Sequence, residues 1–212
     1  MVPLMQTGPD FREEHVLRGG QKILLRHIQP SDAEEVRRGF RALSPESRYR
    51  RFFTGVADLD DAALAYLVNV DCKDHVAIVA ITESLDLKTE RGVGVARFVR
   101  SETDPSVAEA AVTIVDDMQR MGLGTLMTKT LARAAKERGI EKFRCEVLES
   151  NDLVVKALVE AGGTIVERAS GTVVLDVPVS NPDESVVRHA LGVLAEHVNA
   201  FLRRLLPPGA AR

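Results

Sequence analysis

The chain has 212 residues, of which 45% are hydrophobic and 28% are charged, a composition that is ordinary for a soluble globular protein with one domain and extensions or with two small domains. The net charge of −3 gives no support for nucleic-acid binding, so no nucleic-acid partner is expected. No apolar run approaches the roughly 18 residues of a membrane span and no secretion signal stands at the N-terminus, so no membrane partner and a cytoplasmic location are expected.

The N-terminal third of the sequence predicts an arm followed by a strand and two helices. Residues 1–20 mix Pro, Gly and charges without a period, which indicates a loop or a short edge element. Residues 22–28 predict the first strand, and Ser31 or Asp32 then caps a helix. A second helix is expected at residues 44–53, where three arginines stand beside three aromatic residues. Inward packing of the aromatic residues and a binding surface both fit this pattern.

The middle of the chain predicts a short helix and then an antiparallel meander. Residues 59–70 carry apolar side chains at helical spacing. Three β-rich stretches follow at residues 75–81, 92–99 and 107–115, separated by polar, turn-forming segments. The segment Gly92-Val93-Gly94 leads into a strand and not into a helix, so a β-bulge or bend is expected there.

A glycine-marked turn connects the third of these strands to a long helix that is predicted to start near Gln119. Backbone N–H groups in the first turn of a helix have no intrahelical partners, and Gly122 and Gly124 would let an anion approach them closely. A dinucleotide fingerprint would need a third glycine where Met127 stands, and the P-loop pattern is absent. The turn therefore predicts a phosphate-bearing ligand of another class, with an ordinary glycine-containing helix start as the alternative.

The remaining elements complete a βαβ unit and a hairpin. Residues 143–148 predict a strand parallel to the one before the long helix, because strand, crossover helix and strand form a right-handed unit. Asn151 is expected to cap a helix at residues 152–161. Two β-rich stretches at residues 164–168 and 172–177 then predict a hairpin.

The C-terminal tail carries a sustained apolar stripe over residues 183–206, which predicts an amphipathic helix. Its apolar face would pack on its own domain or on a second copy, so a homodimer is one expectation. The chain is accordingly divided into an arm (residues 1–20), a domain (residues 21–178) and a C-terminal linker with a helix (residues 179–212). Cys72 and Cys145 stand alone and are interpreted as small core residues, and no metal site is predicted.

The turn and its surroundings resemble the GCN5-related N-acetyltransferase (GNAT) family. The residues Gln119-Arg120-Met121-Gly122-Leu123-Gly124 are similar to its acyl-CoA signature Q/R-x-x-G-x-G/A. The string L-S-x-E-S-R-Y-x-R-F-F at residues 43–53 resembles bacterial protein lysine acetyltransferases. The resemblance implies an α/β (α+β) fold, in which helices flank a mixed central sheet with a splayed parallel pair of strands. It also implies acetyl-CoA, with coenzyme A as the carrier of the acyl group, as cofactor.

The same resemblance implies the residues of the coenzyme site. Backbone amides of the signature would hold the pyrophosphate, and a backbone N–H near Val115 would polarise the thioester carbonyl. Asn151 matches an asparagine that bonds the cofactor in the family, although a plain helix cap explains it equally well. The expected cofactor-binding residues are Val115, Gln119, Arg120, Met121, Gly122, Leu123, Gly124, Thr125 and Asn151.

Glu109 is the candidate general base. Along its strand Ala108, Ala110, Val112 and Ile114 share one apolar face, so Glu109 points to the other, less apolar face, where its carboxylate would be partly desolvated. The segment Ala108-Glu109-Ala110-Ala111 resembles the A-E-x-A segment whose glutamate is the base in protein acetyltransferases, and a surface glutamate near a strand start is the alternative. Many family members carry a tyrosine as general acid where Leu158 stands, so the acid is left unassigned.

These features together predict an N-acetyltransferase that moves an acetyl or similar short acyl group from acetyl-CoA to a primary amine. The expected acceptor is a lysine side chain of a protein, attacked directly with Glu109 as base. Two alternatives are retained: acylation of a small amine, and a coenzyme-binding regulatory module without turnover.

Overall fold

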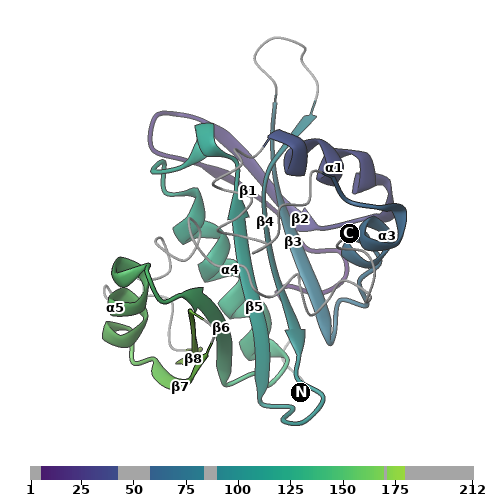
Figure 1. The fold of residues 1–212 in the computed structure, drawn as a ribbon. Coiled ribbons are helices and arrows are strands. Elements are labelled where there is room, and N and C mark those ends of the chain that lie inside the picture. Colours follow the sequence, from purple (N-terminus) through teal and green to yellow (C-terminus); the bar gives the residue numbers. More distant parts are fainter. Residues whose placement is uncertain (1–5, 43–57, 84–89, 170, 180–212) are drawn as a thin grey trace.

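The computed structural model describes residues 6–42, 58–83, 90–169 and 171–179. Eight strands form one sheet in the order β1-β2-β3-β4-β5-β6-β8-β7 (Figure 1). The predicted helices at residues 44–53 and 183–206 and the turn at residues 84–89 lie outside the described residues. The elements are β1 (Arg12–Val16), β2 (Lys22–His27), η1 (Pro30–Asp32), α1 (Ala33–Ala42), α3 (Asp61–Val68), β3 (His75–Glu83), β4 (Glu90–Arg100), β5 (Val107–Ile114), η2 (Asp116–Met118), α4 (Leu123–Glu137), β6 (Lys142–Leu148), α5 (Asp152–Glu160), β7 (Thr164–Ala169) and β8 (Thr172–Pro178).

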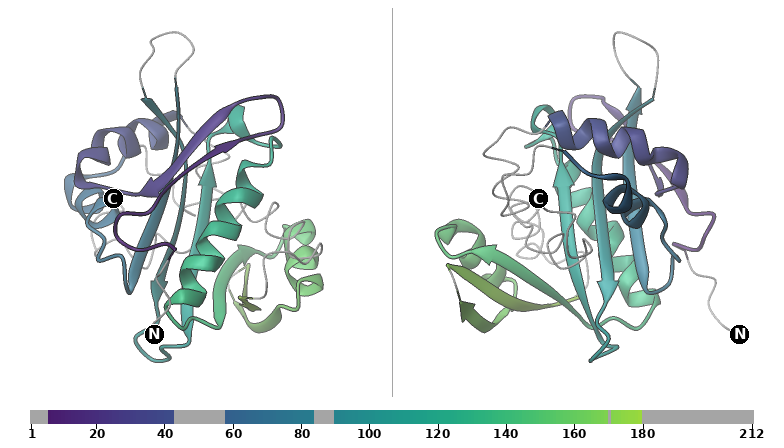
Figure 2. Two further views of the ribbon diagram at one scale, coloured as in Figure 1. Left: turned by 180° about the vertical axis from the view of Figure 1, so that it is seen from behind. Right: turned by 45° about the vertical axis from the view of Figure 1, so that its right-hand side comes forward.

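Helices cover both faces of the central strands. The helices α1 and α3 lie on one face and α4 lies on the other, as the two views in Figure 2 show. On the first face Leu64 and Leu67 of α3 pack with Ala111 of β5, and on the second Met127 and Leu131 of α4 enter the main core. Burial from both sides explains why β3 reads as a continuous apolar run and not as an alternating one.

The predicted antiparallel meander is confirmed, and β4 carries the predicted bulge. Gly94 lies opposite Ala80 and Gly92 lies opposite Ile81, so Val93 is the extra residue between them. A Cβ atom on Gly94 would stand 2.7 Å from the Sδ atom of Met127. Any side chain at position 94 would therefore displace Met127 of α4, which packs directly against the bulged strand.

The parallel pair β5–β6 is splayed, as expected. Its strands pair only from Val107 opposite Lys142 to Glu109 opposite Arg144. Beyond Glu109 the second strand pairs only with β8, along its whole length. The carboxyl-terminal part of β5 thus has a ladder partner on the β4 side alone.

Several predicted boundaries need correction. The arm contributes an edge strand, β1, which pairs with β2 in the sheet, so the edge-element interpretation is the correct one. The long helix α4 begins at Leu123 and not near Gln119, because the 3₁₀ turn η2 and two left-handed residues intervene. The first helix begins at Ala33 after a 3₁₀ turn in which Asp32 accepts the N–H of Gln29.

The two cysteines differ in their surroundings. Cys145 of β6 lies in the main core, and burial raises the pKa of its thiol to about 12. Cys72 is only half-buried, in the turn before β3 with φ 58°, so its interpretation as a core residue is wrong. Within the described ranges no helix is long and apolar enough to span a membrane, and no group of His, Cys, Asp or Glu side chains could hold a metal ion.

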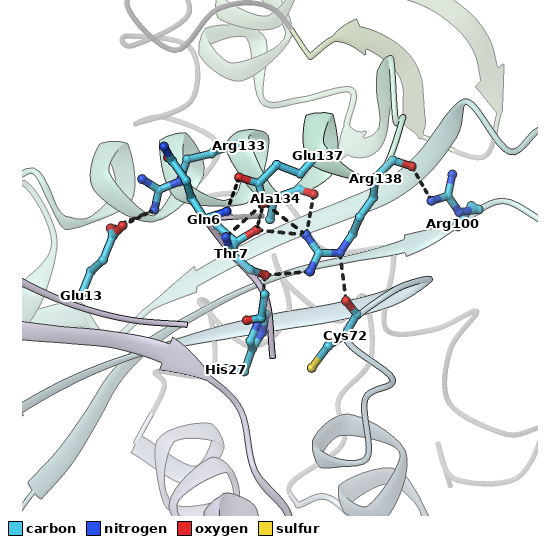
Figure 3. Close-up of polar contacts among 11 residues, drawn as sticks. Gln6, Thr7, Glu13, His27, Cys72, Arg100, Arg133, Ala134, Glu137 and Arg138 are labelled. Carbon is cyan, nitrogen blue, oxygen red and sulfur yellow. Dashed lines mark hydrogen bonds and ion pairs between the residues drawn. The ribbon is translucent and has the colours of Figure 1, made fainter. Parts of the chain in front are cut away.

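Arg138, at the end of α4, ties the N-terminal arm to the sheet (Figure 3). Its side chain is 3% exposed, and its guanidinium donates to the carbonyl oxygens of Thr7, Cys72 and Ala134 at 2.8, 2.9 and 2.8 Å. The neighbouring Glu137 accepts the N–H of Thr7 at 3.0 Å. Two adjacent residues at the end of α4 thus hold the arm and the turn before β3 against the helix.

We expect Arg138→Met to lower the free energy of unfolding by about 3 kcal/mol, because it leaves several buried carbonyls without donors. Urea denaturation followed by circular dichroism measures the change. The exposed Lys136, two residues earlier on α4, supplies the control Lys136→Met, which should alter stability by less than about 0.5 kcal/mol. Equal stability of the two variants would show that the Arg138 contacts do not hold the arm.

Candidate active site

The turn between β5 and α4 has the backbone that an anion site needs. Arg120 and Gly122 adopt left-handed conformations, with φ 62° and 89°, and Gly122 is the N-cap of α4. Glycine is favoured at such a position because it has no Cβ atom to clash with the following carbonyl. The chain therefore folds back sharply and presents the first turn of α4 at the end of β5.

The N-terminus of α4 has no side-chain cap. The first intrahelical bond runs from the N–H of Leu126 to the carbonyl of Gly122 at 3.1 Å, and the side chain of the N-cap supplies no acceptor. The N–H groups of Leu123, Gly124 and Thr125 precede this bond and have no acceptor within the helix. The first turn of α4 also contains no acidic residue, so the positive end of the helix dipole is not neutralised there.

The side chains of the signature divide into structural and exposed groups. Leu123 is fully buried and Met121 packs against the main core, so both anchor the turn. The amide nitrogen of Gln119 donates to Asp116 Oδ1 at 3.0 Å and so braces the same turn. The side chain of Arg120 is exposed and that of Thr125 is half-buried. Contact with an anion would thus come mainly from backbone amides, as the sequence predicts for this turn.

The predicted backbone donor near Val115 needs correction. The N–H of Val115 donates to the carbonyl of Val93 at 3.1 Å, across the β4 bulge. In an antiparallel ladder alternate N–H groups point to the same side. The N–H of Val112 therefore points away from β4 and toward β6, into the part of the splay that lies beyond the last paired residue, Glu109. Sequence reasoning missed this because it could not place β4 and β5 in register.

Asn151 occupies the N-cap position of α5 but does not cap it with its side chain. Its backbone carbonyl accepts the N–H groups of Val154 and Val155 at 3.0 and 3.1 Å. The prediction of a side-chain cap is therefore wrong, and the cofactor contact stays a prediction. Leu158 of the same helix is fully buried, so the structure gives that position no access to solvent or to a leaving group.

Glu109 lies at the last paired position of the parallel strands, on the face of β5 that α3 covers. It shares this face with Ala111, which packs against α3, and it stands opposite Val99 of β4. The residue is half-buried, and its role as base stays a prediction. Burial raises the pKa of Tyr66 on α3, and the charge of Arg97, which lowers it, and that of Glu109, which raises it, oppose each other, so this tyrosine is neutral.

A cavity of about 240 Å³ opens on this same face of the sheet, between α1, α3 and strands β3 to β5. It extends from Thr113 and Val115, at the carboxyl end of β5, to Arg97 in the middle of β4. Glu35 of α1 also lines it and accepts the N–H of Gly92 at the bulge at 2.9 Å. The sequence analysis did not single out Glu35 or Arg97.

Arg97 belongs to a buried polar group on the sheet. It donates to the carbonyl of Leu67 at 2.9 Å and to Nε2 of His75 at 3.2 Å. Burial and, to a smaller extent, the charge of Arg97 together lower the pKa of His75 to about 4, so the imidazole is neutral and able to accept this bond. The signal that could have found Arg97 is a lone charge inside the apolar strand Val93–Val99.

Three features define the class of protein to which this chain belongs. They are the splayed parallel strands β5 and β6, the uncapped first turn of α4 at the carboxyl end of β5, and the cavity on the α1 and α3 face of β5. Together they define an acyl-CoA-dependent N-acyltransferase domain. Comparison with known families agrees with this assignment. Residues 22–164 match the family model described as acetyltransferase (GNAT) domain, and the chain belongs to this family.

Known relatives carry the same description. The chain is 32% identical to acetyltransferase Pat of Mycolicibacterium smegmatis over 79% of its own length and 49% of that protein. It is 31% identical to acetyltransferase PA5475 of Pseudomonas aeruginosa over 60% of its own length and 67% of that protein. The chain thus spans about half the length of the Mycolicibacterium relative.

Solved structures show the same fold. The GNAT domain of S. lividans PAT superimposes with a TM-score of 0.67 at 27% identity, covering 79% of this chain and 96% of that chain. A cAMP-binding acyltransferase from Mycobacterium smegmatis has a TM-score of 0.54 at 25% identity, covering 97% of this chain and 58% of that chain. The predicted family and fold are therefore confirmed.

Proposed function

We propose that this protein transfers an acetyl group from acetyl-CoA to a primary amine, and that the amine is a lysine side chain of a protein. The observation that carries the proposal is the arrangement around β5. At the carboxyl end of this strand, the uncapped first turn of α4 suits a diphosphate. Glu109 faces the α1 and α3 side of the same strand.

In this proposal the coenzyme lies in the splay between β5 and β6. The N–H groups of Leu123, Gly124 and Thr125 hold its diphosphate, and the exposed Arg120 adds a positive charge. The N–H of Val112 polarises the thioester carbonyl, since it points into the splay. The side chain of Asn151, which the α5 N-terminus does not use, bonds the pantetheine arm.

Glu109 acts as the general base on the acceptor side. Its carboxylate takes a proton from the acceptor ammonium, directly or through one water, and the free amine attacks the thioester carbon. The tetrahedral intermediate carries its negative charge on the oxygen that faces the N–H of Val112. Collapse breaks the carbon–sulfur bond and releases coenzyme A as a thiolate. The attacking nitrogen, which became positively charged, gives its remaining excess proton to this thiolate directly or through water, because the buried Leu158 has no proton to supply.

The protein acceptor is supported by the resemblance of residues 43–53 to bacterial protein lysine acetyltransferases. The acetyltransferase Pat and the GNAT domain of PAT are each similar to 79% of this chain. We propose that the catalytic domain comprises residues 21–178 with β1 added at its edge. On the sequence pattern we also propose that residues 179–212 form a linker and a helix that pairs two copies, in a cytoplasmic protein.

The proposal is tested with the purified chain, acetyl-CoA and two acceptor sets, lysine-containing proteins and a panel of small amines. We expect calorimetry to show binding of acetyl-CoA well below millimolar concentration, and mass spectrometry to show acetyl groups on protein lysines. Labelling confined to small amines would contradict the protein acceptor. Coenzyme binding without any acetylated product would instead indicate a regulatory module.

A further inference from the structure

We propose that the cavity under α1 and α3 binds a carboxylate of the acceptor at Arg97. The inference rests on the proposed function and adds the chemistry by which that same site selects its amine: the preferred acceptor carries a carboxylate close to the reacting amine.

Arg97 is a buried cation in the wall of this cavity. The residue is only 5% exposed, and among the described residues its hydrogen-bond partners are a carbonyl oxygen and a neutral imidazole. Burial lowers its pKa to about 10, which leaves the guanidinium charged at neutral pH. Buried charges in proteins are normally paired with an opposite charge, because removing an ion from water is costly.

The acidic residues that line the cavity are directed elsewhere. Asp32 forms a two-pronged ion pair with Arg26, with both distances at 2.7 Å. Glu35 is bound to the N–H of Gly92 and pairs with Arg38 at 2.6 Å. Glu90 is the remaining acidic residue among the described residues that line the cavity, and it is exposed at the start of β4. Glu109 lies on the same face of β5 but does not line the cavity. Among the described residues, no carboxylate accepts a hydrogen bond from Arg97.

A structural role explains only part of this arrangement. Leu67 is in the last turn of α3, so its carbonyl carries part of the negative end of the helix dipole and Arg97 stabilises that end. A helix end is equivalent to only about half an elementary charge. A guanidinium also has five N–H donors, and the bonds to Leu67 and His75 use two of them. Both charge and donors therefore remain for a planar anion such as a carboxylate.

The position of Arg97 fits an acceptor that reaches toward the thioester. Arg97 lies opposite Ala111 on β5, and the cavity continues along this strand to Thr113 and Val115. The guanidinium bonds His75, which lies opposite Val99 and so level with Glu109 of β5. The two residues from Glu109 to Ala111 span roughly 7 Å of strand, which an extended lysine side chain can cover, and the N–H of Val112 follows directly. A carboxylate at Arg97 would thus leave the amine near the N–H of Val112.

The carboxylate could come from the acceptor's own main chain or from an acidic residue beside a protein lysine, and two matched pairs of acceptors separate these sources. The first pair is Nα-acetyl-lysine and its carboxamide, and the second is a lysine peptide with Asp or Asn next to the lysine. With acetyl-CoA, we expect kcat/KM to be about 10-fold higher or more for the carboxylate member of one pair, chiefly through KM. The pair that responds identifies the source.

Variants then assign the preference to Arg97. We expect Arg97→Gln to abolish the difference within the responding pair, and Arg97→Lys to keep part of it. The exposed Arg12 of β1 supplies the control Arg12→Gln, which should retain the whole difference. Urea denaturation and calorimetry with coenzyme A verify that each variant is folded and binds the cofactor.

Equal kcat/KM within both pairs for the wild-type chain would overturn the proposal, even if Arg97→Gln fails to fold. A folded Arg97→Gln protein that keeps the preference would also overturn it. If no acceptor in either pair is acetylated, the proposed function fails. The carboxylate site is then decided by calorimetry of Nα-acetyl-lysine against its carboxamide on the chain loaded with coenzyme A, where equal binding overturns it.

Discussion

Replacement of Glu109 by Gln is expected to lower kcat about 100-fold while leaving the affinity for acetyl-CoA nearly unchanged. The carboxamide has the same shape as the carboxylate but cannot take a proton from the ammonium, and positioned general bases contribute about 10²–10⁴-fold. Glu109 lies where the parallel strands part and faces away from the splay that would hold the coenzyme, so its loss should not disturb cofactor binding. Steady-state kinetics with a lysine acceptor and calorimetry with coenzyme A measure the two quantities.

The exposed Glu141, which precedes β6, supplies the matched control Glu141→Gln. This variant should retain wild-type kcat, because it removes the same charge at a distance from the cavity. Unchanged turnover in Glu109→Gln would remove Glu109 from the mechanism. A parallel loss of coenzyme affinity would instead assign Glu109 a structural role in holding the splayed strands.

The fold follows from local patterns that the tertiary structure does not override. The meander of β3, β4 and β5 could be predicted because polar, turn-forming segments separate three apolar stretches. The bulge at Gly92–Gly94 could be predicted because glycines inside a strand mark a close backbone approach, and α4 makes that approach through Met127. The splay of β5 and β6 came from the family resemblance, since pattern alone cannot say where a parallel pair ends.

The site was predictable where backbone conformation creates it and not where distant side chains converge. The turn at Gly122 is local, so its glycines reveal it. The ion pair of Asp32 with Arg26 and the contact of Arg97 with His75 join separate elements, and only the register of the sheet brings them together. The donor near Val115 was misplaced for the same reason, because the register of β5 with β4 decides which N–H groups of β5 are used in the sheet.

The proposed diphosphate site at the N-terminus of α4 is tested by a pair of substitutions, Gly124→Glu and Gly124→Gln. Gly124 is the second residue of α4 and is half-buried. Both variants add nearly equal bulk, and glycine is a poor helix former, so the helix itself should not be weakened by either change. A carboxylate about 5 Å from a diphosphate charge repels it by about 3 kcal/mol at an effective dielectric constant of about 20.

We therefore expect Gly124→Glu to bind coenzyme A about 100-fold more weakly than Gly124→Gln, as measured by calorimetry. The difference should shrink as the salt concentration rises, because ions screen a partly exposed charge pair. Loss of affinity from the added bulk would appear equally in both variants and would be independent of salt. Equal affinity of the two variants would place the diphosphate away from the N-terminus of α4, since no anion held by the N–H groups of Leu123 and Thr125 could ignore a charge between them.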